Sequence, residues 1–252
     1  MTFDVAAEAY DRFMGRYSVQ LAPQLAELGG VEAGQRVLDV GCGPGALTGE
    51  LVRRLGAGAV AAVDPSDPFV AAAKARHPGV EVQRASAERL PFGDGTFDAA
   101  LAQLVVHFMA DPVAGLREMA RVTRPGGVVA ACVWDHAGDR TPLAVFWRAA
   151  HELDPGTQGE SALAGAREGH LAELLAAAGV TSVEEATLQA AIEFVSFEEW
   201  WDPFTFGVGP AGAYAGTLDD APLAALRDRC RELLGPPPFT VSTAAWAASG
   251  RV

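Results

Sequence analysis

The stretch RVLDVGCGPGALTGEL near the N-terminus combines a strand pattern with groups that can hold a small ligand. Asp39 lies inside an apolar run, and Gly41, Gly43 and Gly45 follow it at alternate positions. Glycines permit a tight turn and let the backbone approach a ligand closely. The helix expected after the turn directs its first amide groups toward it. A glycine-rich turn alone is a weak signal, because it suits a dinucleotide as well as other nucleoside-containing ligands.

Two carboxylates make this signal more specific. Asp39 stands where a dinucleotide-binding fingerprint usually has an apolar residue, and a buried carboxylate needs partners such as loop amides or a ligand ammonium group. Asp64 ends the next apolar run, 19 residues after Gly45. An acid at that place can accept both hydroxyls of an adenosine ribose. The alternative for Asp64 is a turn acid or a helix cap before Pro68.

Polar groups also follow the next two apolar runs. Ser86 and Ala87 come directly after the third run and offer a hydroxyl and a backbone amide to an adenine edge. Gln103 ends the fourth run, and His107 follows one helical turn later. Because ligands of open α/β sheets bind at the carboxyl ends of the strands, these groups predict a single ligand site at one sheet edge.

The elements that must position these residues follow from the hydrophobic pattern. Apolar runs alternate with helical patterns, which is typical of a parallel sheet flanked by helices. The predicted strands cover residues 36–40, 59–64, 80–84, 97–103 and 127–134, with helices at 46–55, 68–76 and 112–122. Two further strands are expected at 187–195 and 238–249, and helical insertions at 136–165 and 197–236 are expected to form a cap over the carboxyl edge.

The motifs together resemble a known family. They are VLDVGCGPG, VDPS, ASAERLPFGDGTFD, LVVHFMADP and VTRPGG, all within residues 36–127. The chain is similar to class I S-adenosylmethionine-dependent methyltransferases, in particular to the broad type 11 group that includes the ubiquinone and menaquinone C-methyltransferases. This resemblance implies an α/β fold: a Rossmann-like seven-stranded mixed sheet with its last strand antiparallel, helices on both faces and a helical cap.

The same resemblance implies S-adenosylmethionine as the cofactor. Its methionine moiety, which carries an ammonium group, would lie at Asp39 and the glycine turn, its ribose at Asp64, and its adenine at Ser86 and Ala87. The family often has an acidic residue at the position of Ser86, so the adenine contact is expected to be weaker or to rest on the backbone. The segment AYDRFMGRYS resembles the one that closes over the cofactor, which adds Tyr17. The predicted cofactor-binding residues are Asp39, Gly41, Cys42, Gly43, Gly45, Asp64, Pro65, Ser86, Ala87, Gln103 and Tyr17.

Methyl transfer from a sulfonium is an in-line displacement, so the main task of the protein is to align acceptor, methyl and sulfur. A base is needed only if the acceptor must lose a proton. His107 is the histidine within the motifs that suits this task, and it is the predicted catalytic residue. The alternative is that His107 packs beside the adenine or bonds to a backbone carbonyl.

Aromatic residues predict the acceptor pocket. Trp134 ends the fifth predicted strand, and Trp200, Trp201 and Phe204 lie in an irregular apolar segment rich in glycine and proline. Such a segment over a cleft suits a pocket wall, so these four residues are the predicted substrate-binding set. The alternative is an ordinary hydrophobic core, which is where most aromatic clusters lie.

Composition limits the classes of function. The chain has 252 residues, half of them hydrophobic, enough for a single domain over 1–252 with an N-terminal helical cover (1–30) and a cofactor-binding core (36–134). A net charge of −13 disfavours nucleic acid and anionic membrane surfaces as partners. Three widely spaced cysteines show neither a disulfide nor a metal-binding rhythm, which favours a cytoplasmic location and no metal.

The sequence thus predicts an enzyme that methylates O, N or C of a small, partly apolar molecule. One alternative is a regulatory protein that binds the cofactor without catalysis. A second is an NAD-dependent dehydrogenase, but its tyrosine–lysine pair is missing, since the single lysine is Lys74 and the tyrosines are Tyr10, Tyr17 and Tyr214. The sequence makes no prediction of the oligomeric state.

Overall fold

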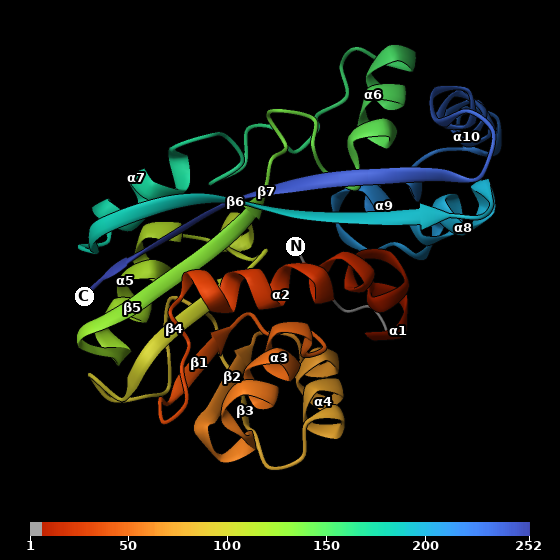
Figure 1. The fold of residues 1–252 in the computed structure, drawn as a ribbon. Helices are drawn as coiled ribbons and strands as arrows, with labels where there is room; N and C mark the ends of the chain where they lie inside the picture. Colours follow the sequence, from red (N-terminus) through yellow and green to blue (C-terminus); the bar gives the residue numbers. More distant parts are fainter. Residues whose placement is uncertain (1–6) are drawn as a thin grey trace.

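The protein is built on a seven-stranded sheet with strand order β3-β2-β1-β4-β5-β7-β6, in a computed structural model that describes residues 7–252 (Figure 1). The first six residues of the predicted cover lie outside the described part. The strands are β1 Val37–Val40, β2 Val60–Asp64, β3 Glu81–Arg84, β4 Phe97–Gln103, β5 Thr123–Trp134, β6 Thr181–Phe194 and β7 Phe239–Arg251. Strand β7 runs antiparallel between β5 and β6, and the remaining pairs are parallel, which confirms the predicted sheet.

The helices follow the strands closely in sequence. They are α1 Ala7–Tyr10, η1 Asp11–Gly15, α2 Arg16–Leu28, α3 Ala46–Leu55, η2 Ala57–Ala59, α4 Asp67–Arg76, η3 Val106–Phe108, α5 Pro112–Val122, α6 Ala144–Leu153, α7 His170–Ala177, α8 Phe197–Trp201, η4 Asp202–Phe206, α9 Gly209–Ala215 and α10 Asp220–Leu234. The four parallel strands β1 to β4 begin within one residue of their predicted starts. This agreement reflects short apolar runs bounded by glycine, proline and charged residues.

Strands β5 and β6 are longer than predicted. Helix α5 ends at Val122 as expected, but the chain continues directly as β5 from Thr123. Thr123 pairs with Phe97 of β4, and the amide of Gly126 donates to the carbonyl of Val252 at 2.8 Å, so β4 and the C-terminal residues supply the partners for this early part of β5. Strand β6 begins at Thr181 because β7 extends far enough to pair with it there. Partners distant in the sequence therefore set both strand starts.

Side chains alternate between the two faces of the sheet along β1, and this alternation determines where Asp39 points. Val37 packs with residues of α2 and α3 on one face of the sheet, and Leu38 packs with residues of α5 and α7 on the other. Side chains two residues apart in a strand share a face. Asp39 therefore points to the α3 face, where the hydroxyl of Thr48 donates to it.

Two glutamines of α2 cover the open edge of β6. Gln24 donates to the carbonyl of Gln189 at 2.8 Å and accepts from its amide at 3.0 Å. One helical turn earlier, Gln20 makes the same pair of bonds with Ala191, both at 3.1 Å. Each side-chain amide thus takes the place of a peptide group of a neighbouring strand. Because an unpaired sheet edge is a template for aggregation, these contacts protect β6 and also dock α2.

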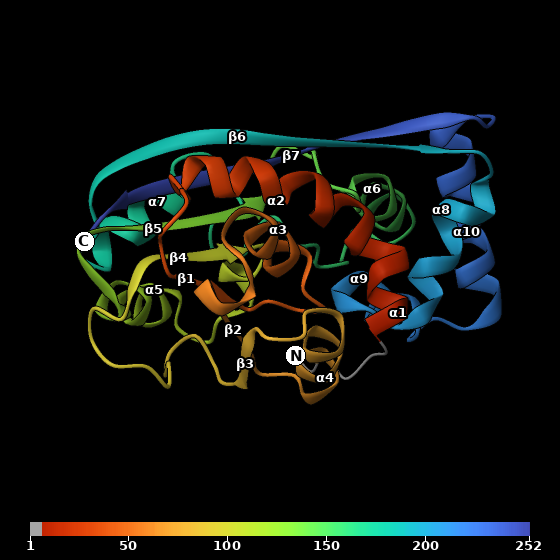
Figure 2. The ribbon, with the colours of Figure 1, turned by 60° about the horizontal axis from the view of Figure 1, so that its bottom comes forward.

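The helical insertions pack against each other beside the far ends of β6 and β7 (Figures 1 and 2). Phe146 of α6 stacks on Phe204 with ring centroids 4.6 Å apart and an interplanar angle of 2°. Arg229 of α10 and Glu152 of α6 form an ion pair at 2.5 Å. The β6–β7 pair is longer than the neighbouring strands, and it carries this helical cap beyond the parallel part of the sheet.

We expect Gln24→Ala to lower the free energy of unfolding by about 1–3 kcal/mol, because its two bonds to Gln189 and its bond to the carbonyl of Gln20 are lost and the edge of β6 is opened. Chemical denaturation of the two proteins measures this difference. The control is Gln158→Ala, since Gln158 is exposed and makes no hydrogen bond within residues 7–252. Equal losses in the two variants would show that the edge contacts contribute nothing specific.

Candidate cofactor and acceptor site

Two hollows lie along the carboxyl edge of the parallel strands and meet at the glycine turn. The first, of about 440 Å³, is bordered by the ends of β2 and β3 and by η3. The second, of about 430 Å³, lies between the turn after β1, the start of α3 and the N-terminal helices. Both are lined by Tyr10, Gly41 and Gly43, so they adjoin one another there.

Two glycines of the turn lie where a side chain would not be tolerated. Gly41 has φ +73°, and a Cβ there would lie 2.6 Å from a methyl group of Val105. Gly43 has φ +53°, and a Cβ there would have no neighbour within 4 Å. Such a Cβ would occupy part of the hollows that Gly43 lines, so a glycine at this position keeps that space open.

Asp39 is fully buried and has an unused hydrogen-bonding position. Its Oδ2 accepts from the hydroxyl of Thr48 at 2.6 Å, while its Oδ1 has no partner within residues 7–252. Burial raises the pKa of Asp39 to about 7, against the lowering effect of Thr48. A nearby cation would stabilise the charged form of this buried carboxylate. Asp39 lines the second hollow, from which a ligand cation could reach it. The primary ammonium group of a methionine moiety fits this requirement.

Asp64 ties the turn after β1 to the start of α4. Its Oδ2 accepts from the amide of Gly43 at 2.9 Å, and its Oδ1 accepts from the amide of Ser66 at 2.8 Å. Burial raises its pKa, and these two bonds oppose the shift. The N-cap of α4 is Ser66, so the role of Asp64 is not that of a helix cap. Each carboxylate oxygen keeps a second lone pair for a ligand hydroxyl, and Asp64 lines the first hollow.

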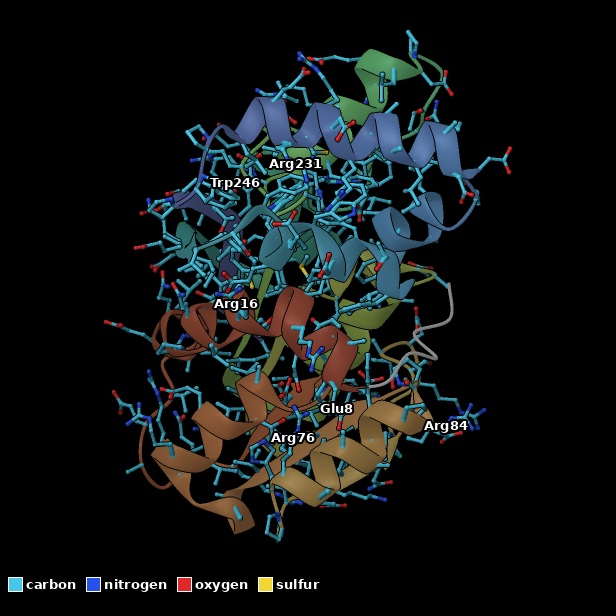
Figure 3. All side chains as sticks on the ribbon, turned by 90° about the vertical axis from the view of Figure 1, so that its right-hand side faces the viewer. Glu8, Arg16, Arg76, Arg84, Arg231 and Trp246 are labelled. Carbon is cyan, nitrogen blue, oxygen red and sulfur yellow. The ribbon has the colours of Figure 1, made fainter. Side chains whose placement is uncertain are left out.

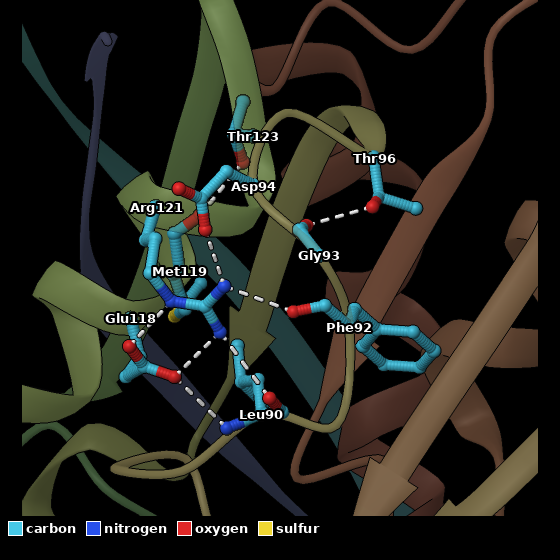
Figure 4. A network of polar contacts seen from close by, with 9 residues as sticks. All are labelled: Leu90, Phe92, Gly93, Asp94, Thr96, Glu118, Met119, Arg121 and Thr123. Carbon is cyan, nitrogen blue, oxygen red and sulfur yellow. Dashed lines mark hydrogen bonds and ion pairs between the residues drawn. The ribbon is translucent and has the colours of Figure 1, made fainter.

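Ser86, Ala87 and Pro65 line the first hollow together with apolar side chains, among them Phe69 and Phe108. The loop that carries Ser86 and Ala87 is held by a network on α5 (Figure 4). The guanidinium of Arg121 donates to the carbonyls of Leu90 and Phe92 and to the carboxylates of Asp94 and Glu118. The amide of Leu90 donates to Glu118 in turn. This network joins the loop of the motif ASAERLPFGDGTFD to Glu118 and Arg121 of α5.

The remaining predicted cofactor residues differ in their surroundings. Gln103 lines the second hollow, donates to the carbonyl of Ser18 at 3.0 Å and has a buried Oε1 without a partner within residues 7–252. Gly45 and Cys42 line the same hollow, and Cys42 also packs with Val70 and Ala73 of α4. Tyr17 lines neither hollow, since its ring packs edge-on against Trp134 at 6.0 Å.

His107 lies apart from these hollows, in a small inner cavity of about 40 Å³. It is 9% exposed, and its Nδ1 is buried without a partner within residues 7–252. Burial and the neighbouring His136 hold the pKa of His107 well below its usual range. The imidazole is therefore neutral near pH 7, able to accept a proton but only as a weak base. Tyr10 lines this cavity as well as both hollows, so it stands between them.

The structure separates the four residues that were predicted to form the acceptor pocket into two groups. Trp134 lines the inner cavity, but Trp200, Trp201 and Phe204 line neither it nor the two hollows. Those three are at most 3% exposed and pack among themselves and with Phe146 in the core of the cap. Both adjacent tryptophans are enclosed, since Trp201 stacks with Phe146 of α6 and Trp200 packs against Phe204. The arrangement makes these three residues part of the core rather than a pocket wall.

Ion pairs hold the N-terminal helices between the cofactor side and the cap (Figure 3). Arg76 at the end of α4 pairs with Asp11 and donates to the carbonyl of Pro44 in the glycine turn at 3.2 Å. Arg16 pairs with Glu199 of α8 at 2.8 Å. The N-terminal segment is thus attached to both parts.

Sequence reasoning missed several residues that line these spaces. Ser18 and Phe69 border the hollows, and the helical and aromatic patterns around them offered no sign of it. Glu160 and His136 line the inner cavity, and both come from loops within the predicted helical insertion at 136–165. A buried position is visible only once the cap packs over these loops.

Comparisons with known proteins agree with this geometry. Residues 38–131 match the family described as "Methyltransferase domain". The chain is 36% identical over 110 residues to the ubiquinone/menaquinone biosynthesis C-methyltransferase of Bdellovibrio bacteriovorus, covering 42% of this chain and 47% of that protein. It is 45% identical over 103 residues to the demethylmenaquinone methyltransferase of Mycolicibacterium paratuberculosis, covering 41% and 43%. The chain thus spans less than half the length of these curated relatives.

Solved structures show the same fold. The YcgJ protein of Bacillus subtilis has a TM-score of 0.56 at 18% identity, covering 91% of this chain and 97% of that one. The sheet order, the glycine turn and the domain match agree with the fold of class I methyltransferases that use S-adenosylmethionine. Residues 38–131 match the type 11 methyltransferase domain, and this part of the chain is distantly similar to quinone methyltransferases. The antiparallel β7 between β5 and β6 argues against the dehydrogenase alternative, whose sheet has the order 3-2-1-4-5-6.

We expect the affinity for S-adenosylhomocysteine to rise with pH through about 7 in the native protein and to be weaker and flatter in Asp39→Asn. The pKa of Asp39 is raised in the folded state, so without ligand this group loses stability as pH rises from about 4 to about 7. A ligand ammonium favours the carboxylate and offsets that loss. Calorimetric titrations and denaturation at about pH 6, 7 and 8 measure both effects.

The comparison between the two proteins isolates Asp39 from other titrating groups. Asp39→Asn keeps an acceptor for the Thr48 hydroxyl, so its ligand-free stability is expected to depend less on pH than that of the native protein. Identical pH slopes for affinity and stability in the two proteins would contradict this assignment.

Proposed function

We propose that the protein transfers the methyl group of S-adenosylmethionine to O, N or C of a small, partly apolar molecule. The observation that carries the proposal is the pair of carboxylates on either side of the glycine turn. Asp39 presents an unpaired buried oxygen to one hollow, and Asp64 borders the adjoining one. One elongated ligand with an ammonium at one end and a ribose near its middle satisfies both.

The protein's own residues would hold the cofactor in an extended form. Asp39 would receive the ammonium, and Asp64 the ribose hydroxyls. The amide and hydroxyl at Ser86 and Ala87 would meet the adenine, whose faces lie against apolar side chains. Pro65, Cys42 and the three glycines would shape the surrounding walls, and Gln103 would offer its unpaired Oε1. Tyr17, buried behind Trp134, would act by supporting that wall.

The reacting group of the acceptor would enter the inner cavity beside Tyr10, His107 and Trp134, whose volume of about 40 Å³ suits a few atoms. When bound, the cofactor supplies an electrophilic methyl group on a sulfonium. The cavity walls exclude water and hold the acceptor in line, which is the main contribution to catalysis of this kind. A neutral His107 would accept a proton where the acceptor has one to lose. A methyl-transfer assay separates this enzyme from a cofactor-binding protein without catalysis.

The segments of the chain would have distinct roles in this function. The N-terminal segment would cover the cofactor, residues 36–134 would bind it, and the two helical insertions would close the acceptor side. A small molecule, rather than a nucleic acid or a membrane surface, would be the partner. Within residues 7–252 no helix has the length and apolarity to cross a bilayer. The three cysteines are buried and free, in keeping with a reducing cytoplasm.

We expect Asp64→Ala to weaken binding of S-adenosylmethionine at least about tenfold, since two ligand hydroxyls lose a charged acceptor worth about 1.5–3 kcal/mol. The variant should also lose about 1–3 kcal/mol of stability, because the amides of Gly43 and Ser66 lose their acceptor. Calorimetry and thermal melts measure these effects. The control is Asp67→Ala, which removes an exposed acid from the same hollow. Unchanged cofactor affinity in Asp64→Ala would sink the ribose assignment.

We expect His107→Asn to reduce the turnover of a proton-losing acceptor by about 10²-fold or more while leaving cofactor affinity intact. The lowered pKa of His107 further implies that activity does not fall between about pH 8 and pH 6 through protonation of this residue. The assay uses labelled methyl transfer to acceptors found by screening small apolar molecules. Near-native turnover in the variant would make His107 a packing residue.

A further inference from the structure

The inner cavity adjoins a second space on the side of the cap. A hollow of about 360 Å³ lies between α6 and the loop around residues 159–161, with Trp147 and Arg148 on its wall. His136 and Glu160 line this hollow and also line the inner cavity. These two side chains therefore form the wall that the two spaces share. A ligand that displaces them would approach Tyr10 and His107 from the outer hollow.

Glu160 is a buried acid without a cation. It is 5% exposed, and its Oε2 accepts a hydrogen bond from the indole nitrogen of Trp147 at 2.8 Å. That is its only side-chain hydrogen bond within the described chain, and no arginine, lysine or histidine of residues 7–252 forms an ion pair with it. Burial raises its pKa to about 7, against the lowering effect of Trp147. Its charged form is poorly compensated by the protein itself.

The two neighbouring histidines do not supply the missing charge. The rings of His107 and His136 lie 5.7 Å apart at their centroids, in an edge-on arrangement. Burial lowers the pKa of His136 to about 4 and that of His107 well below its usual range, so both are neutral near pH 7. The buried Nε2 of His136 and Nδ1 of His107 lack partners within residues 7–252. Three polar side chains thus converge on one narrow space with unused hydrogen-bonding capacity.

We propose that the junction between the two spaces binds the amino group of the methyl acceptor, which is a small aromatic or aliphatic amine. This inference rests on the proposed function and names its substrate class. The ammonium form lies at the carboxylate of Glu160, with His136 beside it, and the apolar body lies along Trp147 in the outer hollow. The ammonium gives one proton to the carboxylate of Glu160, which frees the lone pair of the nitrogen. A small advance toward Tyr10 and His107 then brings the neutral nitrogen to the inner cavity, where its lone pair can accept the methyl group.

Charge decides between an amine and the other acceptor classes. A carboxylic acid would place a second negative charge beside Glu160, which is unfavourable in a buried site. A neutral alcohol or phenol would accept or donate one bond but would leave the carboxylate without a counter-charge. An ammonium supplies the charge, and indole faces attract cations as well. The overall charge of −13 also raises the local concentration of cations rather than anions.

The experiment compares 2-phenylethylamine with 2-phenylethanol, which share a carbon skeleton and differ in the charged group. Each probe is titrated into the full-length protein by calorimetry near pH 8, with and without S-adenosylhomocysteine. We expect the amine to bind the native protein at least about tenfold more tightly than the alcohol. In Glu160→Gln this preference should fall to less than about twofold. The control Glu152→Gln removes an acid on the wall of the same hollow that is half exposed and paired with Arg229, and it should keep the preference.

Equal affinity of the two probes for the native protein overturns the proposal, as does binding of neither. A preference that survives in Glu160→Gln also overturns it. The comparison in the native protein decides the matter even if that variant does not fold. Cofactor binding is read separately in the same titrations. Loss of cofactor binding with the amine preference intact would sink the proposed methyl transfer and leave the amine site standing.

Discussion

The carboxylate of Asp64 is the constraint on which the rest of the site depends. By accepting the amides of Gly43 and Ser66, it ties the turn after β1 to the start of α4 after β2. The glycines of this turn have no side chains with which to hold its shape, and the amides of Gly41 and Cys42 also donate to the carbonyl of Val63 at 2.8 and 2.9 Å. Together with these bonds, the bond from Gly43 to Asp64 fixes the turn relative to the end of β2 and so the relation between the two adjoining hollows. Arg76 adds a second attachment through the carbonyl of Pro44.

Several unpaired buried polar groups gather around the spaces of the candidate site, while the Tyr17 hydroxyl and Trp246 Nε1 lie outside them. Most buried polar atoms in proteins have a hydrogen-bond partner. Here the exceptions within residues 7–252 include Oδ1 of Asp39, Oε1 of Gln103, Nδ1 of His107 and Nε2 of His136, and each of these residues lines one of the adjoining spaces. The desolvation of these groups lowers the stability of the folded protein, because no hydrogen bond within residues 7–252 compensates for it. A bound cofactor and acceptor would remove that penalty, which couples ligand binding to stability.

The N-terminal helices have a structural as well as a covering role. Gln20 and Gln24 attach α2 to the edge of β6, Arg16 attaches its start to the cap, and Asp11 attaches the preceding turn to α4. Tyr10 lies among these attachments and lines all three spaces of the site. Movement of this segment would thus change the cofactor and acceptor sides together, because the same few residues border both.

The sequence by itself determined the parallel core and the cofactor side of the site. Period-two alternation places Asp39 on the α3 face, and glycines at alternate positions permit a turn that other residues resist. These features depend on neighbours within a few residues, so a local pattern is sufficient to predict them. The loop from 85 to 96 differs in this respect, because the Arg121 that holds it lies 29 and 31 residues beyond the carbonyls that it binds.

Only the tertiary structure decided which buried residues face the acceptor space. Trp134 borders the inner cavity, whereas Trp200, Trp201 and Phe204, which have the same character in the sequence, are enclosed by the cap. Glu160 and His136 lie in loops but are buried. The early start of β6 likewise comes from its pairing with Arg251 of β7, and that of β5 from Phe97 and Val252. Hydrophobic pattern predicts that a residue is buried, but the cavity it faces depends on how segments distant in sequence pack against one another.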